Sequence, residues 1–150
     1  MKVALACLAR FRERLSGVHP SALRAVATNA FRVAANAREF LPRAERALGS
    51  RIDVISGHEE ARLIYLGVAH ELPPSDTPRL VVDIGGGSTE FIIGRGLEPE
   101  RRESLTLGCV STTRKVFPDG IVRASPFAAA EPAARAALPA HSRGCGPAPL

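Results

Sequence analysis

The sequence predicts an α/β domain, and two patterns in its 150 residues support this prediction. Short apolar runs rich in β-branched residues stop at helix or glycine signals, and the segments between them repeat apolar residues at helical spacing. Runs of four to eight apolar residues bounded by turn signals are typical of buried strands, whereas repeats at three and four positions are typical of helices. A hydrophobic content of 45% is enough for the core of one domain.

The first predicted elements are a helix over 2–16 and a strand over 23–27. The helix would place Ala4, Leu8, Phe11 and Leu15 on one face and end at Gly17. A second helix is expected over 28–36, directly after the strand, with Arg32 about one turn into it. A helix that starts after a strand can bind an anion, and a guanidinium there can reach a phosphate. The alternative is that Arg32 is a solvated surface arginine.

Three further elements are predicted before the middle of the chain. A helix over 37–48 would begin with a capping box of Asn36 and Glu39 and end at Gly49. A strand over 51–55 leads into a helix over 56–68 that Ser56 can cap. Glu59 and Glu60 lie in its first turn, where the helix dipole favours acids. That electrostatic role is a sufficient explanation for one of the two glutamates.

A strand, a glycine turn and a second strand form the centre of the predicted fold. The strand over 80–84 is followed by Gly85, Gly86, Gly87 and Ser88, and a second alternating strand runs over 89–94. Consecutive glycines have no side chains to pack, but they allow backbone N–H groups to approach a ligand. Such a group of amides suits an anion, above all a phosphate. The alternative is an ordinary hairpin with a glycine-rich turn.

Two carboxylates flank this turn, because Asp83 closes the first strand and Glu90 opens the second. Hard oxygen ligands suit magnesium, and Mg²⁺ commonly binds together with phosphate oxygens. We therefore expect Asp83 and Glu90 to hold Mg²⁺ beside a phosphate-binding turn.

The remaining chain is predicted to form a strand over 101–107 and a helix from Gly108 to about Phe117. Residues 124–150 contain ten alanines and five prolines. We expect a domain over 1–120 and an Ala/Pro-rich tail over 121–150. Within that tail, a helix over 127–138 would be interrupted by Pro132, and the last ten residues would be disordered.

Composition narrows the class of protein further. A net charge of +5 favours anionic partners without naming one, since polyphosphate, nucleic acid and simple solubility are all compatible with it. Three widely spaced cysteines form neither a metal pattern nor an evident disulfide framework, which favours a reducing cytoplasm. No apolar run approaches the ~20 residues of a membrane span.

Three motifs together resemble the exopolyphosphatase and guanosine pentaphosphate phosphatase family, in the family's order. They are the threonine, arginine and Ala-x-Asn pattern over 28–36, Ile-Ser-Gly-x-Glu-Glu-Ala-x-Leu over 55–63, and Asp-Ile-Gly-Gly-Gly-Ser-Thr-Glu over 83–90. The resemblance covers residues 2–120. It implies a ribonuclease-H-like fold of the actin-like ATPase superfamily, here incomplete at the N-terminus and lacking the second half-domain.

The resemblance also implies an activity and residue roles. The family removes terminal phosphate from inorganic polyphosphate, or the terminal 5′ phosphate from guanosine pentaphosphate, with Mg²⁺. By resemblance Glu60 is the catalytic base, Arg32 contacts phosphate, and the turn at Gly85, Gly86, Gly87 and Ser88 is a phosphate-binding loop. We expect this chain to be cytoplasmic, with inorganic polyphosphate or guanosine pentaphosphate rather than nucleic acid as partner. The resemblance further implies that full-length relatives are homodimers.

Three rival functions remain open on sequence grounds. The chain could be a nucleotide-dependent kinase or ATPase of the same superfamily. It could be a polyphosphate-binding fragment without catalysis, because the family's first phosphate loop is not found in it. It could also be a truncated product without function.

Overall fold

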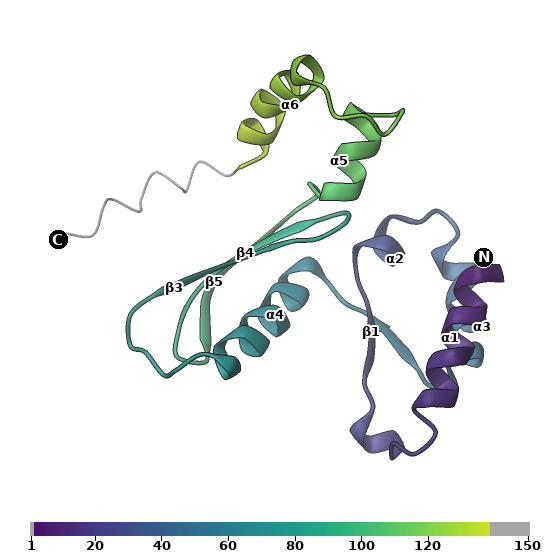
Figure 1. Cartoon of the computed structure of the whole chain (residues 1–150). Coiled ribbons are helices and arrows are strands. Elements are labelled where there is room, and N and C mark those ends of the chain that lie inside the picture. The colour runs from purple at the N-terminus through teal and green to yellow at the C-terminus, as the bar shows by residue number, and fades with distance from the viewer. Residues whose placement is uncertain (1, 139–150) are drawn as a thin grey trace. The chain divides into compact units, whose positions relative to one another are not determined.

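The computed structural model describes residues 2–138 (Figure 1), and these residues divide into two compact units, 2–60 and 61–138. The first unit contains α1 (Lys2–Arg14), the 3-10 helix η1 (Pro20–Ala22), β1 (Ala25–Ala27), α2 (Asn29–Val33), α3 (Ala37–Leu48) and β2 (Ile52–Val54). Helix α4 (Gly57–Glu71) begins in the first unit and continues in the second. The second unit also contains β3 (Arg79–Ile84), β4 (Thr89–Arg95), β5 (Glu98–Leu105), α5 (Cys109–Val116) and α6 (Ala124–Ala137).

The first unit is built on two parallel strands. In the pairing of β1 with β2, Ala27 lies opposite Val54, and the N–H of Ile55 donates to the carbonyl of Ala27 at 3.0 Å. Helix α2 follows β1 directly, and α4 follows β2. Because the strands are parallel, both helices start from the same end of this small sheet.

Small and aliphatic side chains form the core of the first unit. Its buried members are Ala27, Ala44, Leu48 and Ile52, with Leu8, Ala25, Phe31, Phe40 and Leu41 packed around them. Helix α1 packs on α3. The predicted apolar face of α1 is only partly correct, because Phe11 is 53% exposed and Ala4 is also exposed.

The predicted bounds of α3 are confirmed, but its predicted start signal is not. Asn36 occupies the N-cap position, yet its side chain makes no capping hydrogen bond. Gly49 ends the helix with a φ of 77°, in the left-handed region that favours glycine.

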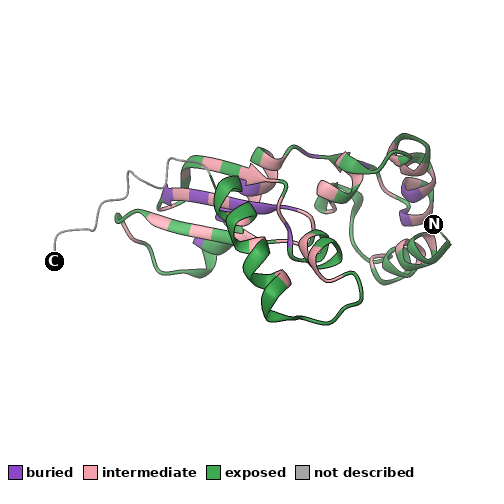
Figure 2. Ribbon diagram, turned by 90° about the horizontal axis from the view of Figure 1, so that it is seen from above, coloured by how far each residue is buried: buried purple, intermediate pink, exposed green. Residues whose placement is uncertain are grey.

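The second unit is an antiparallel meander in the order β3-β4-β5, with α4 on one face (Figure 1). Ala61, Tyr65 and Ala69 of α4 are buried against Ile92 of β4. Figure 2 marks the buried stretches of the ribbon in purple. On the opposite face of β3, three apolar side chains are exposed: Leu80, Val82 and Ile84. The predicted strand–turn–strand unit is confirmed, because β3 and β4 flank residues 85–88. Strand β5 begins at Glu98, three residues earlier than predicted.

The C-terminal helix differs in detail from its prediction. Helix α6 starts at Ala124 and continues through Pro132, which the sequence predicted to interrupt it. The predicted disorder of the last ten residues lies outside the described part of the chain. None of the helices within residues 2–138 is long and apolar enough to cross a bilayer.

Gly49 provides a test of the first unit. A Cβ at this position would lie 2.9 Å from Nε of Arg12, on a backbone with a φ of 77°. We expect Gly49→Ala to lower the free energy of unfolding by about 1–2 kcal/mol, the cost of a left-handed backbone for an L-residue. Urea denaturation measures this change. Gly17→Ala is the matched control, because a Cβ there meets nothing within 4 Å; equal stability of the two variants would contradict the account.

Candidate active site

Arg32 and Glu60 form an ion pair within the first unit. Nη1 of Arg32 lies 2.9 Å from Oε2 of Glu60 and also donates to the carbonyl of Ile55 at 2.9 Å. The two side chains are only 23% and 14% exposed, so the pair is largely shielded from solvent. The structure thus brings together two predicted site residues that lie 28 positions apart in the sequence.

The backbone explains how this pair is positioned. Arg32 lies on α2 and Glu60 in the first turn of α4, and these helices leave the same end of the β1–β2 pair. Ser56 caps α4 as predicted, because its Oγ accepts from the N–H of Glu59 at 3.2 Å. The carbonyl of Ser56 accepts from the N–H of Glu60 at 2.9 Å, which fixes the backbone that carries the glutamate.

Arg32 keeps donors for an additional partner. Both of its hydrogen bonds use Nη1, and within residues 2–138 neither Nη2 nor Nε donates to another atom. Helix α2 has only five residues, so few aligned peptide dipoles support the predicted anion site at its N-terminus. The guanidinium is therefore the group on this helix that can bind a phosphate.

The glycine turn lies in the second unit between paired strands. Ile84 of β3 is opposite Thr89 of β4, and the N–H of Gly85 donates to the carbonyl of Ser88 at 2.9 Å. The next three N–H groups, those of Gly86, Gly87 and Ser88, donate to no atom in the described chain. Successive amides without protein acceptors are the feature that anion-binding turns share.

The first N–H groups of helix α5 hold this turn by donating to its carbonyl oxygens. The carbonyl of Gly85 accepts from the N–H of Cys109 at 2.9 Å, and the carbonyl of Gly86 accepts from Val110 and Ser111 at 3.0 Å each. The first N–H groups of a helix lack acceptors of their own. The carbonyls of the turn supply those acceptors, and the N–H groups of Gly86, Gly87 and Ser88 keep no acceptor within the described residues.

Gly108 lets the helix approach this closely. A Cβ on Gly108 would lie 2.3 Å from the nitrogen of Gly87 and 2.4 Å from the carbonyl carbon of Gly86. Both atoms belong to the backbone of the turn, so they cannot move aside like the end of a flexible side chain. Gly108 is therefore required where it stands.

Three polar side chains lie in register next to the turn, one on each strand. Asp83 is opposite Glu90, and Glu90 is opposite Ser104, so the three share one face of the sheet. Glu90 is 1% exposed, and Ser104 Oγ donates to its Oε1 at 2.8 Å. Its other oxygen, Oε2, is buried without a hydrogen-bond partner among the described residues. Such an oxygen is costly to bury, which indicates a ligand or water at this position.

This arrangement fits a magnesium ion held with phosphate. Within residues 2–138 no group of three or more His, Cys, Asp or Glu side chains could enclose a metal. Mg²⁺ rarely needs one, because it keeps several waters and binds one or two carboxylates together with phosphate oxygens. Asp83 and Glu90, with the unpartnered Oε2, match that set of ligands.

Two residues of this site were not singled out by the sequence. The sequence pattern predicts Ser104 only as one residue of a strand, and it is the pairing of β5 with β4 that puts it opposite Glu90. Gly108 was expected only to begin a helix. Its signal was a glycine directly between a strand and a helix, where a close backbone approach is common.

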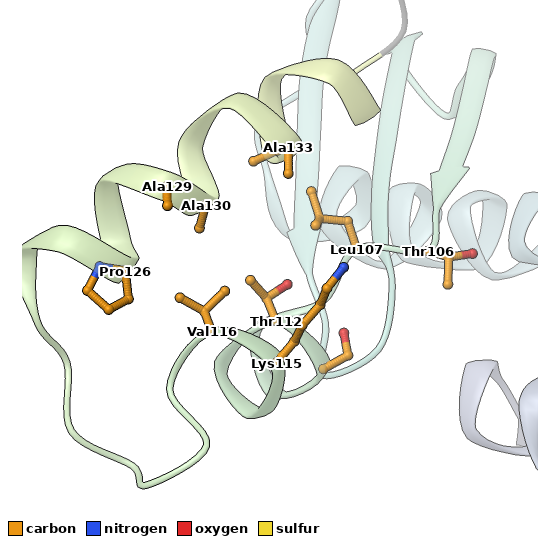
Figure 3. A pocket seen from close by; sticks show the side chains of 11 residues that line it. Thr106, Leu107, Thr112, Lys115, Val116, Pro126, Ala129, Ala130 and Ala133 are labelled. Carbon is orange, nitrogen blue, oxygen red and sulfur yellow. The ribbon is translucent and has the colours of Figure 1, made fainter.

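A separate cavity of about 550 Å³ lies between α5 and α6 (Figure 3). Its lining is mostly apolar, from Leu107, Val116 and several alanines of α6, with Lys115 and Thr112 among its polar members. None of the predicted site residues lines it, so it is not part of the candidate site.

Comparison with solved structures identifies the class of fold. The PPX-GPPA enzyme of Aquifex aeolicus is 37% identical, with 77% of this chain and 38% of that chain covered and a TM-score of 0.63. An exopolyphosphatase-like protein is 33% identical, with 88% of this chain and 44% of that chain covered and a TM-score of 0.78. An exopolyphosphatase from Cytophaga hutchinsonii is 29% identical, covers 94% and 45%, and has a TM-score of 0.79. The chain has the predicted α/β fold, and it shares this fold with part of each of these three solved chains.

Within that class the family is also defined. The model of the Ppx/GppA phosphatase family matches residues 1–145. The chain therefore belongs to the Ppx/GppA phosphatase family, as its three motifs indicated. It spans 38–45% of the length of the solved relatives described above.

Gly108→Ala tests the contact between α5 and the glycine turn. Inserting a methyl group into this packed backbone contact should lower the free energy of unfolding by about 1–3 kcal/mol. It should also weaken tripolyphosphate binding, because the turn is displaced from its anchor. Denaturation and isothermal titration calorimetry measure the two effects. Gly67→Ala, on an open part of α4, is the control. If Gly108→Ala binds tripolyphosphate as tightly as the wild-type chain, the proposed anchoring is wrong.

Proposed function

We propose that this chain carries the catalytic and phosphate-binding groups of an exopolyphosphatase-type hydrolase, which releases terminal phosphate from inorganic polyphosphate by attack of water. The observation that supports this most is the glycine turn. Its N–H groups at Gly86, Gly87 and Ser88 have no acceptor within the described residues, and they lie beside a buried carboxylate with an unpartnered oxygen.

Phosphate binding is assigned to backbone amides and one arginine. The turn offers the N–H groups of Gly86, Gly87 and Ser88 to a terminal phosphate, because the N–H of Gly85 already donates to the carbonyl of Ser88. Arg32 offers the Nη2 and Nε donors that its protein contacts leave unused. Hydrogen bonds from a charged guanidinium to phosphate are about twice as strong as neutral ones. The net charge of +5 also favours a polyanionic substrate.

Water activation is assigned to Glu60. In the proposed reaction, a water oxygen bonds to the terminal phosphorus while the bond from phosphorus to the bridging oxygen breaks. The water proton passes to the Glu60 carboxylate, and the electron pair of the broken bond remains on the shortened polyphosphate. Arg32, which contacts Glu60 at 2.9 Å, orients that carboxylate and balances negative charge. Positioning and charge neutralisation are the main requirements of such phosphoryl transfer.

Asp83 and Glu90 are assigned to Mg²⁺. When bound, Mg²⁺ would neutralise charge on the phosphoanhydride oxygens. Within the protein, the register of β3 with β4 keeps the two carboxylates side by side, and burial holds Glu90 in place.

Two alternatives fit particular observations. Guanosine pentaphosphate offers the same terminal phosphoanhydride chemistry, and the family name covers both kinds of phosphatase. A polyphosphate-binding fragment without catalysis would need only the amides of the turn.

Glu60→Gln separates catalysis from binding. The amide keeps the size of the side chain but cannot take the water proton, so phosphate release from long-chain polyphosphate in Mg²⁺ should fall by about 10²–10⁴-fold. Polyphosphate affinity should stay within a few-fold of wild type. Phosphate release and a filter-binding assay on the purified chain measure the two quantities, with guanosine pentaphosphate as a parallel substrate.

Glu59→Gln is the matched control, since it changes the neighbouring acid of the same helix turn. Normal turnover by Glu60→Gln, or equal loss of turnover in the two variants, would refute the role of Glu60. If the folded wild-type chain binds polyphosphate but releases phosphate from neither substrate, the binding-fragment alternative is correct. Hydrolysis of adenosine nucleotides without polyphosphatase activity would favour a nucleotide-dependent ATPase.

A further inference from the structure

The carboxylate of Glu90 is held from one side only. Ser104 Oγ donates to Oε1 at 2.8 Å, whereas Oε2 has no partner within the described residues. The side chain is 1% exposed, so bulk water does not compensate for the missing contact. Ser104 thus engages the oxygen that a ligand would not use.

The strand register places Ser104 so that its hydrogen bond fixes the orientation of the Glu90 carboxylate. Glu90 lies between Asp83 on β3 and Ser104 on β5, each directly opposite it. The terminal torsion of a glutamate is broad, with no single preferred rotamer. A hydrogen bond from β5 to Oε1 therefore selects one orientation of the carboxylate, and the second oxygen is left for a ligand.

We propose that Ser104 is a positioning residue, which by its hydrogen bond to Oε1 presents Oε2 of Glu90 to a divalent cation shared with Asp83. The proposal rests on the assignment of Asp83 and Glu90 to a metal under the proposed function. Ser104 itself touches neither metal nor phosphate in this account. It acts only through Glu90, in the way that outer-shell hydrogen bonds orient metal-binding carboxylates.

A purely structural role makes a different prediction. In that case the hydroxyl group only satisfies a buried acceptor, and its loss lowers stability without any particular effect on a cation. Metal affinity, measured without turnover, separates the two roles. Mn²⁺ is a suitable probe, because it takes the same oxygen ligands as Mg²⁺ and its free form is quantified by electron paramagnetic resonance.

The experiment titrates Mn²⁺ into the full chain in the presence of tripolyphosphate, for wild type and variants. Ser104→Ala should weaken Mn²⁺ binding about tenfold, the usual effect of removing an outer-shell partner. Ser104→Thr keeps the hydroxyl group and should bind nearly as well as wild type. Thr106→Ala, which removes a nearby exposed hydroxyl without a hydrogen bond in the described chain, should leave the affinity unchanged. Thermal unfolding of each variant is measured in parallel.

The outcomes distinguish this inference from the proposed function. If Glu90→Gln loses Mn²⁺ affinity while Ser104→Ala keeps it, Ser104 is only structural and the metal assignment stands. If wild type binds no Mn²⁺, or Glu90→Gln and Asp83→Asn bind it normally, the metal assignment fails and this inference with it. Should Ser104→Ala not fold, Ser104→Cys has a similar volume and a weak donor, and the same loss is expected.

Discussion

The contact between α5 and the glycine turn is the constraint on which the candidate phosphate site depends. A turn of successive glycines has many accessible conformations, and ordering it is entropically costly. Here the first N–H groups of α5 bind the carbonyls of Gly85 and Gly86, which fixes the turn and satisfies the helix start. With those two carbonyls bound to the helix, the N–H groups of Gly86, Gly87 and Ser88 have no acceptor among the described residues, and we propose that an anion binds them. Only a glycine at position 108 permits the approach.

Each of the two units carries a different set of functional groups. The first unit provides a charged pair, Arg32 and Glu60, on two helices that leave the same end of a parallel strand pair. The second provides backbone N–H groups and a row of three polar side chains on an antiparallel meander, of which Glu90 is buried. In both, side chains that lie far apart in sequence meet because strand pairing fixes where their elements begin. The fold therefore places functional groups at strand ends, as α/β proteins commonly do.

Local patterns in the sequence were sufficient to predict the elements, but not all of their contacts. Alternation around Gly85–Ser88 revealed two strands and a turn, and Ser56 revealed the start of α4. The contact of Arg32 with Glu60 was not predictable from spacing, because it depends on the parallel pairing of β1 with β2. The role of Ser104 was hidden for the same reason, since only the register of β4 with β5 places it at Glu90. The exposure of Phe11 shows the converse error, in which helical periodicity suggests burial that the packing does not provide.

The central claim is that the free amides of the glycine turn bind the phosphate, and amide chemical shifts test it most directly. Tripolyphosphate would be titrated into the ¹⁵N-labelled chain with Mg²⁺ present. The account predicts that the largest shifts occur at the N–H signals of Gly86, Gly87 and Ser88. The three signals should also give the same dissociation constant for tripolyphosphate. Small shifts at these three signals, with larger ones at the arginine-rich helix α1, would show that polyphosphate binds by surface charge alone and would contradict the account.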